Sequence, residues 1–414
     1  MISKAQTFLN CIGCFEDSLL RLHVRLYFQM KITFIILVFS LFLTGCDYNS
    51  KQSVQFRSEN IKLLSYSPEI ETAIIGYYSY DKDSSTLIYF DPFEMKEKKS
   101  LAIPGRIISA HFIENGLSIF VATSDIDGNF ETDDGLLMKV DYATGKVLSK
   151  CNIVNRHTYS VAFNPGTKYV YMLSGKYDHY NSILSKCSLD SLREAISVEY
   201  GEKSENLELV PELGKIYVLG NVEYGNTRYY ERSSGKTPYY NINVFDADLL
   251  IPITSIAVPF EPERIEYIGN NKLIVTNRYC MYTKGPTLAV IDASSDSIIF
   301  DKTLYLKYKM GLSSLYFEET TNRIYCTTEL LSLWIDEYNY EDFLKGKPEF
   351  ISAFTRFFIS LNPDDFTFQH YFPSFQPLYD VVAVPGKVCT RVFCFNSRSE
   401  EGFLFYTDIP NNAF

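Results

Sequence analysis

The feature that most constrains the fold is a repeat of short apolar segments along the chain. These segments start at Ile74, Phe120, Tyr171, Tyr217, Ile274, Tyr325 and Phe393. Their start positions are 46, 51, 46, 57, 51 and 68 residues apart. Short strands at this period predict the blades of a β-propeller, because one blade cannot bury both of its faces without neighbours.

Turn signals divide each repeat unit into four strands. After a first strand, the unit that includes residues 272–300 predicts a middle strand, a loop, a third strand, a turn opened by Asp292 and a fourth strand. An Asp in this position accepts hydrogen bonds from backbone amides two residues further on. Seven such units predict an all-β fold, a single β-propeller of seven four-stranded blades.

The last unit lacks a fourth strand of its own. Its third strand ends at Asp408, and only six residues follow. We therefore expect the segment 53–57, which precedes the first blade, to supply this strand and close the ring.

The repeat resembles the YVTN/WD40-like propeller superfamily. The resemblance lies in the strands KLIVTN at 272–277 and KIYVLGN at 215–221, and in the Asp-containing turns that follow them. It extends over about residues 60–410 and implies the propeller fold. It implies little about function, because such propellers include lactonases, surface-layer proteins and scaffolds.

The N-terminal part of the chain reads as an export signal. Residues 30–45 combine Lys31 with the mainly apolar stretch 32–43 and small residues at the end, as a secretory signal does. The apolar stretch would form only about 18 Å of helix, short of the roughly 30 Å of a bilayer core. The expected parts of the chain are an extension that is disordered or follows from a wrongly assigned start (1–29), the signal peptide (30–45), a tether with the closing strand (46–58) and the propeller (59–414).

The signal ends in Leu43-Thr44-Gly45-Cys46, which resembles the bacterial lipobox. The resemblance implies that Cys46 carries acyl chains such as palmitate and anchors a lipoprotein in the membrane of the cell envelope. It leaves open the periplasmic face of the inner or outer membrane and the cell surface. The alternative is a cleaved signal with no lipid on the cysteine.

The net charge bears on the class of partner, and the placement of the cysteines bears on the state of their thiols. The formal net charge is −11, so the chain repels phosphate backbones and nucleic acid is not expected as a partner. Six cysteines follow Cys46, and most occupy predicted strands as small apolar residues do. We expect them to be buried free thiols.

An acidic loop in the second repeat unit is the best candidate for a metal site. Calcium binds six to eight oxygens, and short loops supply them at alternate positions. The oxygen-bearing residues at alternate positions here are Asp125, Asp127, Asn129, Glu131 and Asp133. The loop resembles the calcium hairpins of FG-GAP propeller repeats, although Phe130 stands where those have Gly. Either a structural Ca²⁺ site or a solvated acidic hairpin explains it.

Two long insertions rich in aromatic residues are the candidate binding loops. Both connect a middle strand to a third strand, so both should emerge on one face of the ring with the acidic loop. Tyr, Trp and Arg are the usual anchors of recognition surfaces. The candidate residues are Arg228, Tyr229, Tyr230, Tyr239, Trp334 and Tyr338. Aromatic rings that only hold the loops down are the alternative.

Signals for catalysis are few, and no catalytic residue is predicted. The sequence has no G-x-S-x-G, H-E-x-x-H, P-loop or G-x-G-x-x-G motif. The leading hypothesis is thus a binding or scaffolding module whose partner is an envelope protein or a glycan. A lactonase-like hydrolase or lyase that acts at the central channel is the alternative.

Overall fold

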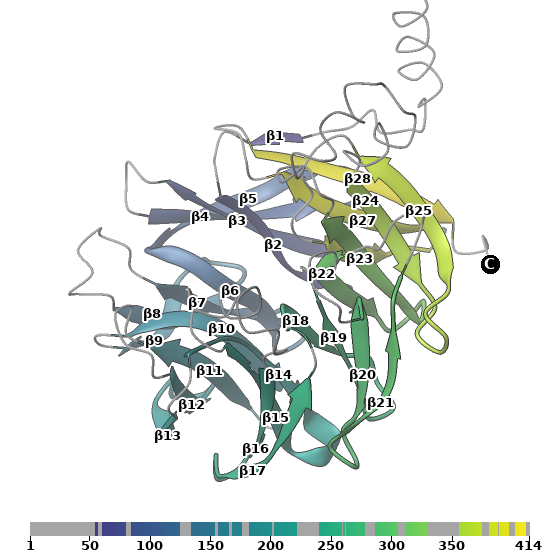
Figure 1. The fold of residues 1–414 in the computed structure, drawn as a ribbon. Coiled ribbons are helices and arrows are strands. Elements are labelled where there is room, and N and C mark those ends of the chain that lie inside the picture. Colours follow the sequence, from purple (N-terminus) through teal and green to yellow (C-terminus); the bar gives the residue numbers. More distant parts are fainter. Residues whose placement is uncertain are drawn as a thin grey trace, which may run out of the picture. The chain divides into compact units, whose positions relative to one another are not determined.

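The repeat units fold into a propeller. Figure 1 shows the computed structural model, which describes residues 54–56, 60–79, 84–124, 134–153, 156–164, 168–175, 182–200, 203–221, 240–258, 260, 262–277, 286–304, 311–329, 356–374, 381–387, 389–396 and 402–410. These residues belong to one compact unit, Ser53–Phe414. They form seven four-stranded antiparallel sheets arranged as a ring of blades. The predicted fold class is confirmed.

The blades follow one another in chain order. Blade 1 contains β2 (Asn60–Ser67), β3 (Thr72–Ser79), β4 (Ser84–Asp91) and β5 (Lys96–Pro104). Blade 2 contains β6 (Arg106–Ile113), β7 (Ser118–Ser124), β8 (Gly135–Asp141) and β9 (Val147–Ile153). Blade 3 contains β10 (His157–Asn164), β11 (Tyr169–Gly175), β12 (Ser182–Ser188) and β13 (Glu194–Tyr200).

The remaining blades have the same order. Blade 4 contains β14 (Lys203–Val210), the short 3-10 helix η2 (Pro211–Leu213), β15 (Lys215–Asn221), β16 (Tyr240–Asp246) and β17 (Pro252–Val258). Blade 5 contains β18 (Arg264–Tyr267), β19 (Lys272–Thr276), β20 (Leu288–Asp292) and β21 (Ser297–Lys302). Blade 6 contains β22 (Gly311–Glu318), β23 (Arg323–Glu329), β24 (Arg356–Leu361) and β25 (Phe368–Ser374).

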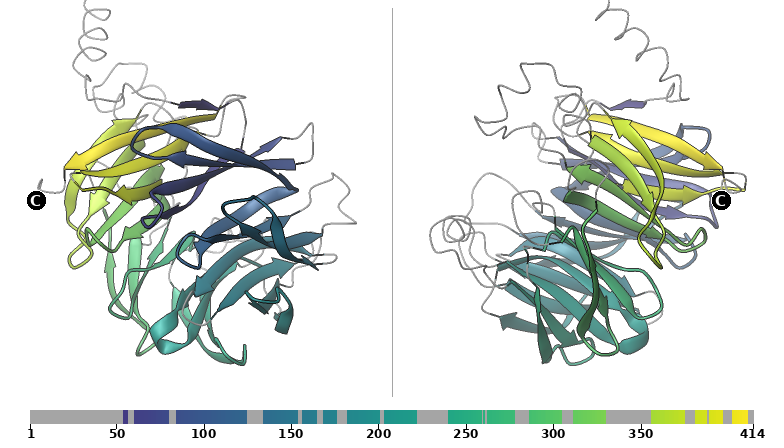
Figure 2. Two further views of the ribbon diagram at one scale, coloured as in Figure 1. Left: turned by 180° about the vertical axis from the view of Figure 1, so that it is seen from behind. Right: turned by 45° about the vertical axis from the view of Figure 1, so that its right-hand side comes forward.

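Blade 7 combines both ends of the propeller sequence. It contains β26 (Val381–Pro385), β27 (Cys389–Asn396), β28 (Gly402–Pro410) and β1 (Val54–Phe56). β1 pairs antiparallel with β28, with Val54 opposite Leu404 and Phe56 opposite Gly402. The fourth strand of the last blade thus comes from the segment in which the sequence predicts it. In Figures 1 and 2 the first blade, in purple, lies beside the last, in yellow.

The core lies between the blades. In the described residues, seven clusters of buried apolar side chains each span one junction between neighbouring blades. The second strand of each blade is covered on both sides, and β7 is buried at every position. The outer strand β9, in contrast, is mostly exposed or half-buried. This gradient explains why the apolar repeat in the sequence marks the second strands.

The residue that starts each apolar repeat faces the next blade. Tyr217 of blade 4, for example, packs among residues of blade 5, and Phe120 of blade 2 packs among residues of blade 3. These two side chains and their equivalents Tyr171, Tyr325 and Phe393 are at most 1% exposed. Most of the aromatic residues at these positions therefore fill blade junctions, as the sequence indicates.

Candidate functional site

The predicted binding and metal residues lie outside the described residues. The structure describes the strands on either side of each loop but not the loops 125–133, 222–239 and 330–355. The residues concerned are Asp125, Asp127, Asn129, Glu131, Asp133, Arg228, Tyr229, Tyr230, Tyr239, Trp334 and Tyr338, and the same holds for Cys46. These assignments stay predictions.

The described strand ends do fix where the three loops start. β7, β15 and β23 are all second strands, and they end at Ser124, Asn221 and Glu329. Equivalent strands of a propeller run in the same direction, so these ends lie on one face of the ring. We call it the long-loop face. The opposite face carries the links from first to second and from third to fourth strands, and we call it the short-turn face.

The third-to-fourth turns are built as the sequence predicts. The carboxylate of Asp91 accepts hydrogen bonds from the amides of Phe93 (2.8 Å) and Glu94 (2.9 Å). Asp246 and Asp292 do the same for amides two residues further on, at 2.9 and 2.8 Å. Each side chain satisfies backbone donors that have no ladder partner in the turn. These acidic residues serve turn geometry on the short-turn face.

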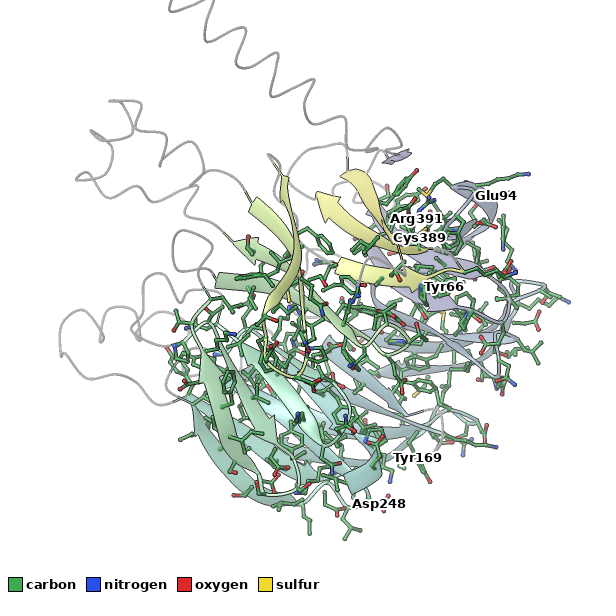
Figure 3. All side chains as sticks on the ribbon, turned by 90° about the vertical axis from the view of Figure 1, so that its right-hand side faces the viewer. Tyr66, Glu94, Tyr169, Asp248, Cys389 and Arg391 are labelled. Carbon is green, nitrogen blue, oxygen red and sulfur yellow. The ribbon has the colours of Figure 1, made fainter. Side chains whose placement is uncertain are left out.

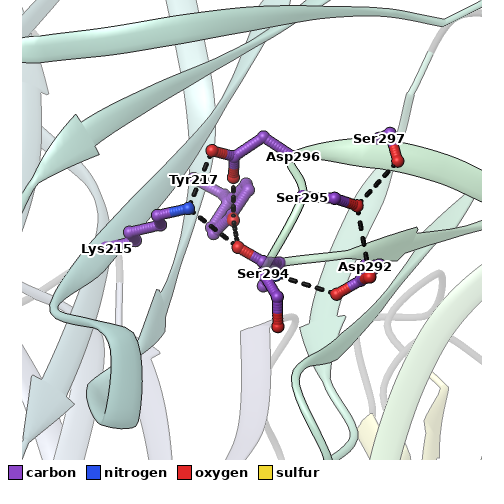
Figure 4. Close-up of polar contacts among 8 residues, drawn as sticks. Lys215, Tyr217, Asp292, Ser294, Ser295, Asp296 and Ser297 are labelled. Carbon is purple, nitrogen blue, oxygen red and sulfur yellow. Dashed lines mark hydrogen bonds and ion pairs between the residues drawn. The ribbon is translucent and has the colours of Figure 1, made fainter.

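Cationic side chains connect these turns to the preceding blade. Lys215 of β15 reaches into blade 5, where it contacts Asp296 Oδ2 at 2.7 Å and the carbonyl oxygen of Ala293 at 2.8 Å (Figure 4). The hydroxyl of Tyr217 donates to Asp296 Oδ1 at 2.6 Å. Burial and the hydrogen bond to Asp296 together raise the pKa of Tyr217. We call the contact of a lysine or arginine side chain with the next blade an inter-blade clamp.

The clamp recurs at other junctions. Lys186 of blade 3 contacts Asp248 Oδ1 of blade 4 at 2.9 Å, and its ammonium lies 4.2 Å from the ring centroid of Tyr169. Figure 3 labels Tyr169 and Asp248. Lys302 of blade 5 donates to the carbonyl oxygen of Asp365 in blade 6 at 2.7 Å. Lys99 of blade 1 lies 3.9 Å from the ring centroid of Tyr142 in blade 2.

Arg391 forms the clamp where the ring closes. Its guanidinium donates to both carboxylate oxygens of Asp408, at 2.6 and 2.7 Å, within blade 7. It also donates to the carbonyl oxygens of Pro92 and Phe93 in blade 1, at 2.9 and 2.8 Å. The guanidinium stacks 4.0 Å from the ring centroid of Tyr406. Figure 3 labels Arg391 together with Glu94, which belongs to the same blade 1 turn.

The central channel has a different character. First strands are innermost in a propeller. Contacts between neighbouring first strands run around the whole ring, from β2·β6 to β22·β26 and back through β2·β26. One register position recurs on these strands, opposite the residue that starts each apolar repeat. Its occupants around the ring are Ser65, His111, Ala162, Glu208, Glu266, Tyr316 and Val382.

Two carboxylates occupy this position in consecutive blades. Glu208 lies on β14 opposite Tyr217, and Glu266 lies on β18 opposite Ile274. Both side chains are half-buried at a blade junction, Glu208 towards blade 5 and Glu266 towards blade 6. Burial and the charge of Glu266 raise the pKa of Glu208 well above its usual range. Burial raises the pKa of Glu266 to about 7, although Arg264 opposes this shift.

Glu266 also connects two blades. Its Oε1 accepts a hydrogen bond from the backbone amide of Phe317 on β22 of blade 6, at 3.3 Å. The neighbouring Tyr316 has a raised pKa because it is buried and lies near the Glu266 carboxylate. A carboxyl group with a pKa near neutrality can donate and accept a proton, so this part of the channel has acid–base capacity.

His111 occupies the same register position in blade 2 but is held neutral. Its Nε2 lies 2.6 Å from Ser109 Oγ, and its ring stacks on Phe163 of blade 3 with centroids 6.0 Å apart. Burial lowers its pKa to about 4. The packing indicates a structural role for this residue.

Sequence reasoning did not identify the two glutamates. A usable signal exists, because the channel position lies nine residues before the start of the apolar repeat in most units. Glu208 and Tyr217 show this spacing, as do His111 and Phe120. An alignment of the first strands to the repeat would place Glu208 and Glu266 side by side in the ring.

The cysteines, metal-binding groups and membrane-spanning helices give no further candidate site within the described residues. Cys151, Cys187, Cys326 and Cys389 are free thiols, and two of them are buried. Within the described ranges, no group of three or more His, Cys, Asp or Glu side chains is arranged to hold a metal ion. Of the part of the chain that the structure describes, no helix is long and apolar enough to cross a bilayer.

Comparison with known proteins gives no family assignment. No family model matches the chain, and no curated protein sequence matches it. The fold is a seven-bladed propeller, which is consistent with the propeller repeat families that the strands resemble.

Proposed function

We propose that this protein is a binding module that recognises its partner through the long-loop face of the propeller. The observation that carries the proposal is the difference between the two faces. Asp turns and inter-blade clamps occupy polar groups of the short-turn face. The opposite face receives the two long insertions. Long loops on a rigid ring are a common place for binding sites.

The ends of the insertions support this proposal. Asn221 and Tyr240 flank the insertion in blade 4, and Glu329 and Arg356 flank the insertion in blade 6. These four residues belong to second and third strands, so each loop starts and ends on hydrogen-bonded inner strands of a four-stranded sheet. The aromatic and arginine content of the loops suits an envelope protein or a glycan as the ligand.

The experiment is a crosslinking pull-down from native membranes with a C-terminally tagged full chain. The test variant replaces Tyr229, Tyr230 and Trp334 with Ala. We expect it to lose a partner that the wild type captures. The matched control replaces Leu117, Leu249 and Ile251 with Ala, since these are 69%, 59% and 54% exposed on the short-turn face. Equal recovery of every partner by the two variants would contradict the proposal.

We also propose that acyl chains on Cys46 hold the module in the bacterial cell envelope. The support is the apolar stretch that ends in the lipobox-like Leu43–Cys46. Metabolic labelling with an alkyne fatty acid should mark the wild type and the control variant Cys389→Ala. Label that persists on Cys46→Ala would refute lipidation at this residue.

A structural Ca²⁺ ion in the loop 125–133 is a further proposal. The alternating oxygen-bearing residues of the loop support it. We expect the thermal midpoint to fall when EGTA replaces calcium, and we expect Asp127→Asn to remove the difference. Identical melting curves in calcium and in EGTA would contradict the Ca²⁺ site and favour the solvated acidic hairpin.

The carboxylate pair favours a second candidate, a hydrolase or lyase that acts in the channel. Glu266 would be the acid–base residue because burial brings its pKa to about 7. A lactone and glycan screen should then give turnover in the wild type that Glu266→Gln abolishes and the exposed-site control Glu94→Gln retains. Equal turnover in both variants would exclude this assignment.

A further inference from the structure

The inference concerns the outer edge of blade 4, which is apart from the long-loop face and from the proposed binding function. The outer strand of this blade is β17, at the rim of the ring in Figure 1, and no strand among the described residues pairs with its outer side. Residues 251–255 are all exposed, and Ile253 is 46% exposed. An unpaired backbone edge with an exposed apolar side chain is typical of strands that accept a further strand.

Two turn hydrogen bonds fix which residues of β16 bond to β17. The backbone amide of Asp246 donates to the carbonyl oxygen of Ile251 at 2.9 Å, on the β17 side. The amide of Ala247 donates to the carbonyl oxygen of Gly214 at 2.8 Å, on the β15 side. Successive strand residues bond to opposite sides in alternation, so the even-numbered residues of β16 bond to β17 and the odd-numbered ones bond to β15.

The same alternation identifies the backbone groups of β17 that point outward. Ser255 lies opposite Asn243, and Ala257 lies opposite Asn241. These two pairs exchange no ladder hydrogen bonds, because the odd-numbered residues of β16 bond to β15. The amide and carbonyl groups of Ser255 and Ala257 therefore point away from the blade, and both residues are exposed. The bulge of this ladder comes earlier in β17, so this part of the edge is regular.

The other outer strands carry features that hinder the addition of a strand. Charged side chains and proline on an edge have this effect. β25 contains Pro373, and β1 has only three residues. Charged residues occur on β5, β9, β13 and β21, whereas residues 249–260, which include β17, contain none. Pro252 is the first residue of β17 and precedes the outward groups.

Charge decides which occupant suits this edge. Two acidic residues precede the uncharged segment 249–260 and two follow it, with one cation at each end, so both ends stay net negative. The residues concerned are Asp246, Asp248 and Lys186 at one end, and Glu261, Glu263 and Arg264 at the other. A second copy that paired β17 with β17 would bring negative ends together, which is destabilising. A strand with lysine or arginine at both ends would meet opposite charge.

We propose that the outer edge of β17 binds an extended segment of a partner protein, which has alternating apolar residues and lysine or arginine at both ends, as a fifth strand of blade 4. The outward amide and carbonyl groups of Ser255 and Ala257 bind the backbone of this segment. Ile253 contacts its apolar side chains, and the acidic ends of the edge select its charge.

The experiment measures the fluorescence anisotropy of a labelled peptide, KKTVTVTKK, with the full chain. We expect saturable binding that Ser255→Pro weakens about tenfold, because proline removes an outward donor and leaves the ladder with β16 intact. The matched control Ser255→Ala keeps the amide and should bind as the wild type does. The peptide EETVTVTEE should bind about tenfold more weakly. Equal binding by Ser255→Pro and Ser255→Ala, or no binding by the wild type, would overturn the proposal.

Amide hydrogen exchange of the wild type keeps the inference testable if Ser255→Pro does not fold. In the free protein, the amides of Ser255 and Ala257 should exchange about tenfold faster than those of Thr254 and Ile256, which bond to β16. The peptide should slow the exchange of the first two amides. Unchanged exchange at both would overturn the proposal. So would a dimer, measured by sedimentation, that Ser255→Pro dissociates, because the edge would then bind a second copy.

Discussion

At the residue scale, equivalent positions of the repeat carry residues whose pKa values shift in opposite directions. His111 and Glu266 occupy the same position on the first strands of blades 2 and 5. Burial lowers the pKa of the histidine to about 4 and raises that of the glutamate to about 7. Desolvation disfavours the charged form in both cases, and the sign differs because one group is a base and the other an acid.

The buried histidine gives a pH prediction at this scale. The pKa of His111 falls from 6.5 in the reference state to about 4 in the folded protein, so the unfolded chain binds the proton first. Relative to His111→Phe, the wild type should lose stability as the pH falls from 6.5 towards 4. Chemical denaturation at several pH values measures this, and His111→Gln should behave as His111→Phe does. Parallel profiles for the three proteins would refute a buried neutral imidazole.

The thiols give a second prediction at this scale. Burial raises the pKa of Cys187 to about 12 and that of Cys326 well above its usual range, while Cys151 and Cys389 are only half-buried. The thiolate is the reactive form. Iodoacetamide should therefore label Cys151 and Cys389 in the native protein at least tenfold faster than Cys187 and Cys326, as peptide mass spectrometry would measure. In the denatured protein, the control, the four cysteines should be labelled at similar rates. Similar rates already in the native protein would contradict the prediction.

At the element scale, the strand and its turn explain how blades are joined. The apolar second strands fill the junctions, while polar side chains on the short-turn face connect each turn to a neighbour. A lysine or arginine reaches carbonyl oxygens of the next blade in four of the described clamps. Carbonyl groups of a tight turn lack ladder partners, so a long cationic side chain satisfies them without a matching carboxylate.

Arg391 is the clamp with the largest expected effect. Arg391→Ala leaves Asp408 and the carbonyl oxygens of Pro92 and Phe93 without their donor. We expect a loss of about 2–4 kcal/mol of unfolding free energy, typical of a charge-assisted network that is largely buried. Urea denaturation measures it. Arg391→Lys should recover only part of the loss, because an ammonium cannot bind Asp408 in the same bidentate way.

The matched control for this clamp is a surface pair. Lys168 lies 3.9 Å from Asp190, and both side chains are more than half exposed. Exposed pairs contribute roughly 0–1 kcal/mol, so Lys168→Ala should change stability little. If Arg391→Ala were as mild as Lys168→Ala, the ring closure would not depend on the clamp.

At the scale of the whole molecule, closure depends on a strand that is distant in sequence from its partner. β1 supplies the outer strand of blade 7 and protects the edge of β28. Unpaired strand edges expose backbone donors and acceptors and promote aggregation. The ring thus joins the two ends of the propeller sequence in one sheet.

Deletion of residues 54–56 from the full chain tests this closure. We expect a loss of about 2–3 kcal/mol, from roughly 1 kcal/mol for each hydrogen bond of the short ladder. Scanning calorimetry measures the change, and light scattering should report earlier aggregation on heating. A deletion of equal length at 49–51 is the control. An unchanged thermal midpoint for the 54–56 deletion would show that β1 does not support the ring.

The sequence by itself determined the number of blades, the positions of the second strands and the Asp turns. These features are local: strand burial repeats as an apolar segment, and a turn needs particular residues within four positions. It also indicated that the chain before blade 1 completes blade 7, because one unit was a strand short. The candidate residues in the loops remain predictions, since the described part of the structure does not include them.

Only the tertiary structure decided what the channel contains. Glu208 and Glu266 are 58 residues apart and carry no local motif. The ring brings their strands into contact, and burial then gives each carboxyl group the raised pKa. Arg391 and Phe93 become neighbours for the same reason, through closure rather than through sequence distance. A pKa shift or a clamp depends on which groups the fold places together and how much water it removes, and no single segment encodes that.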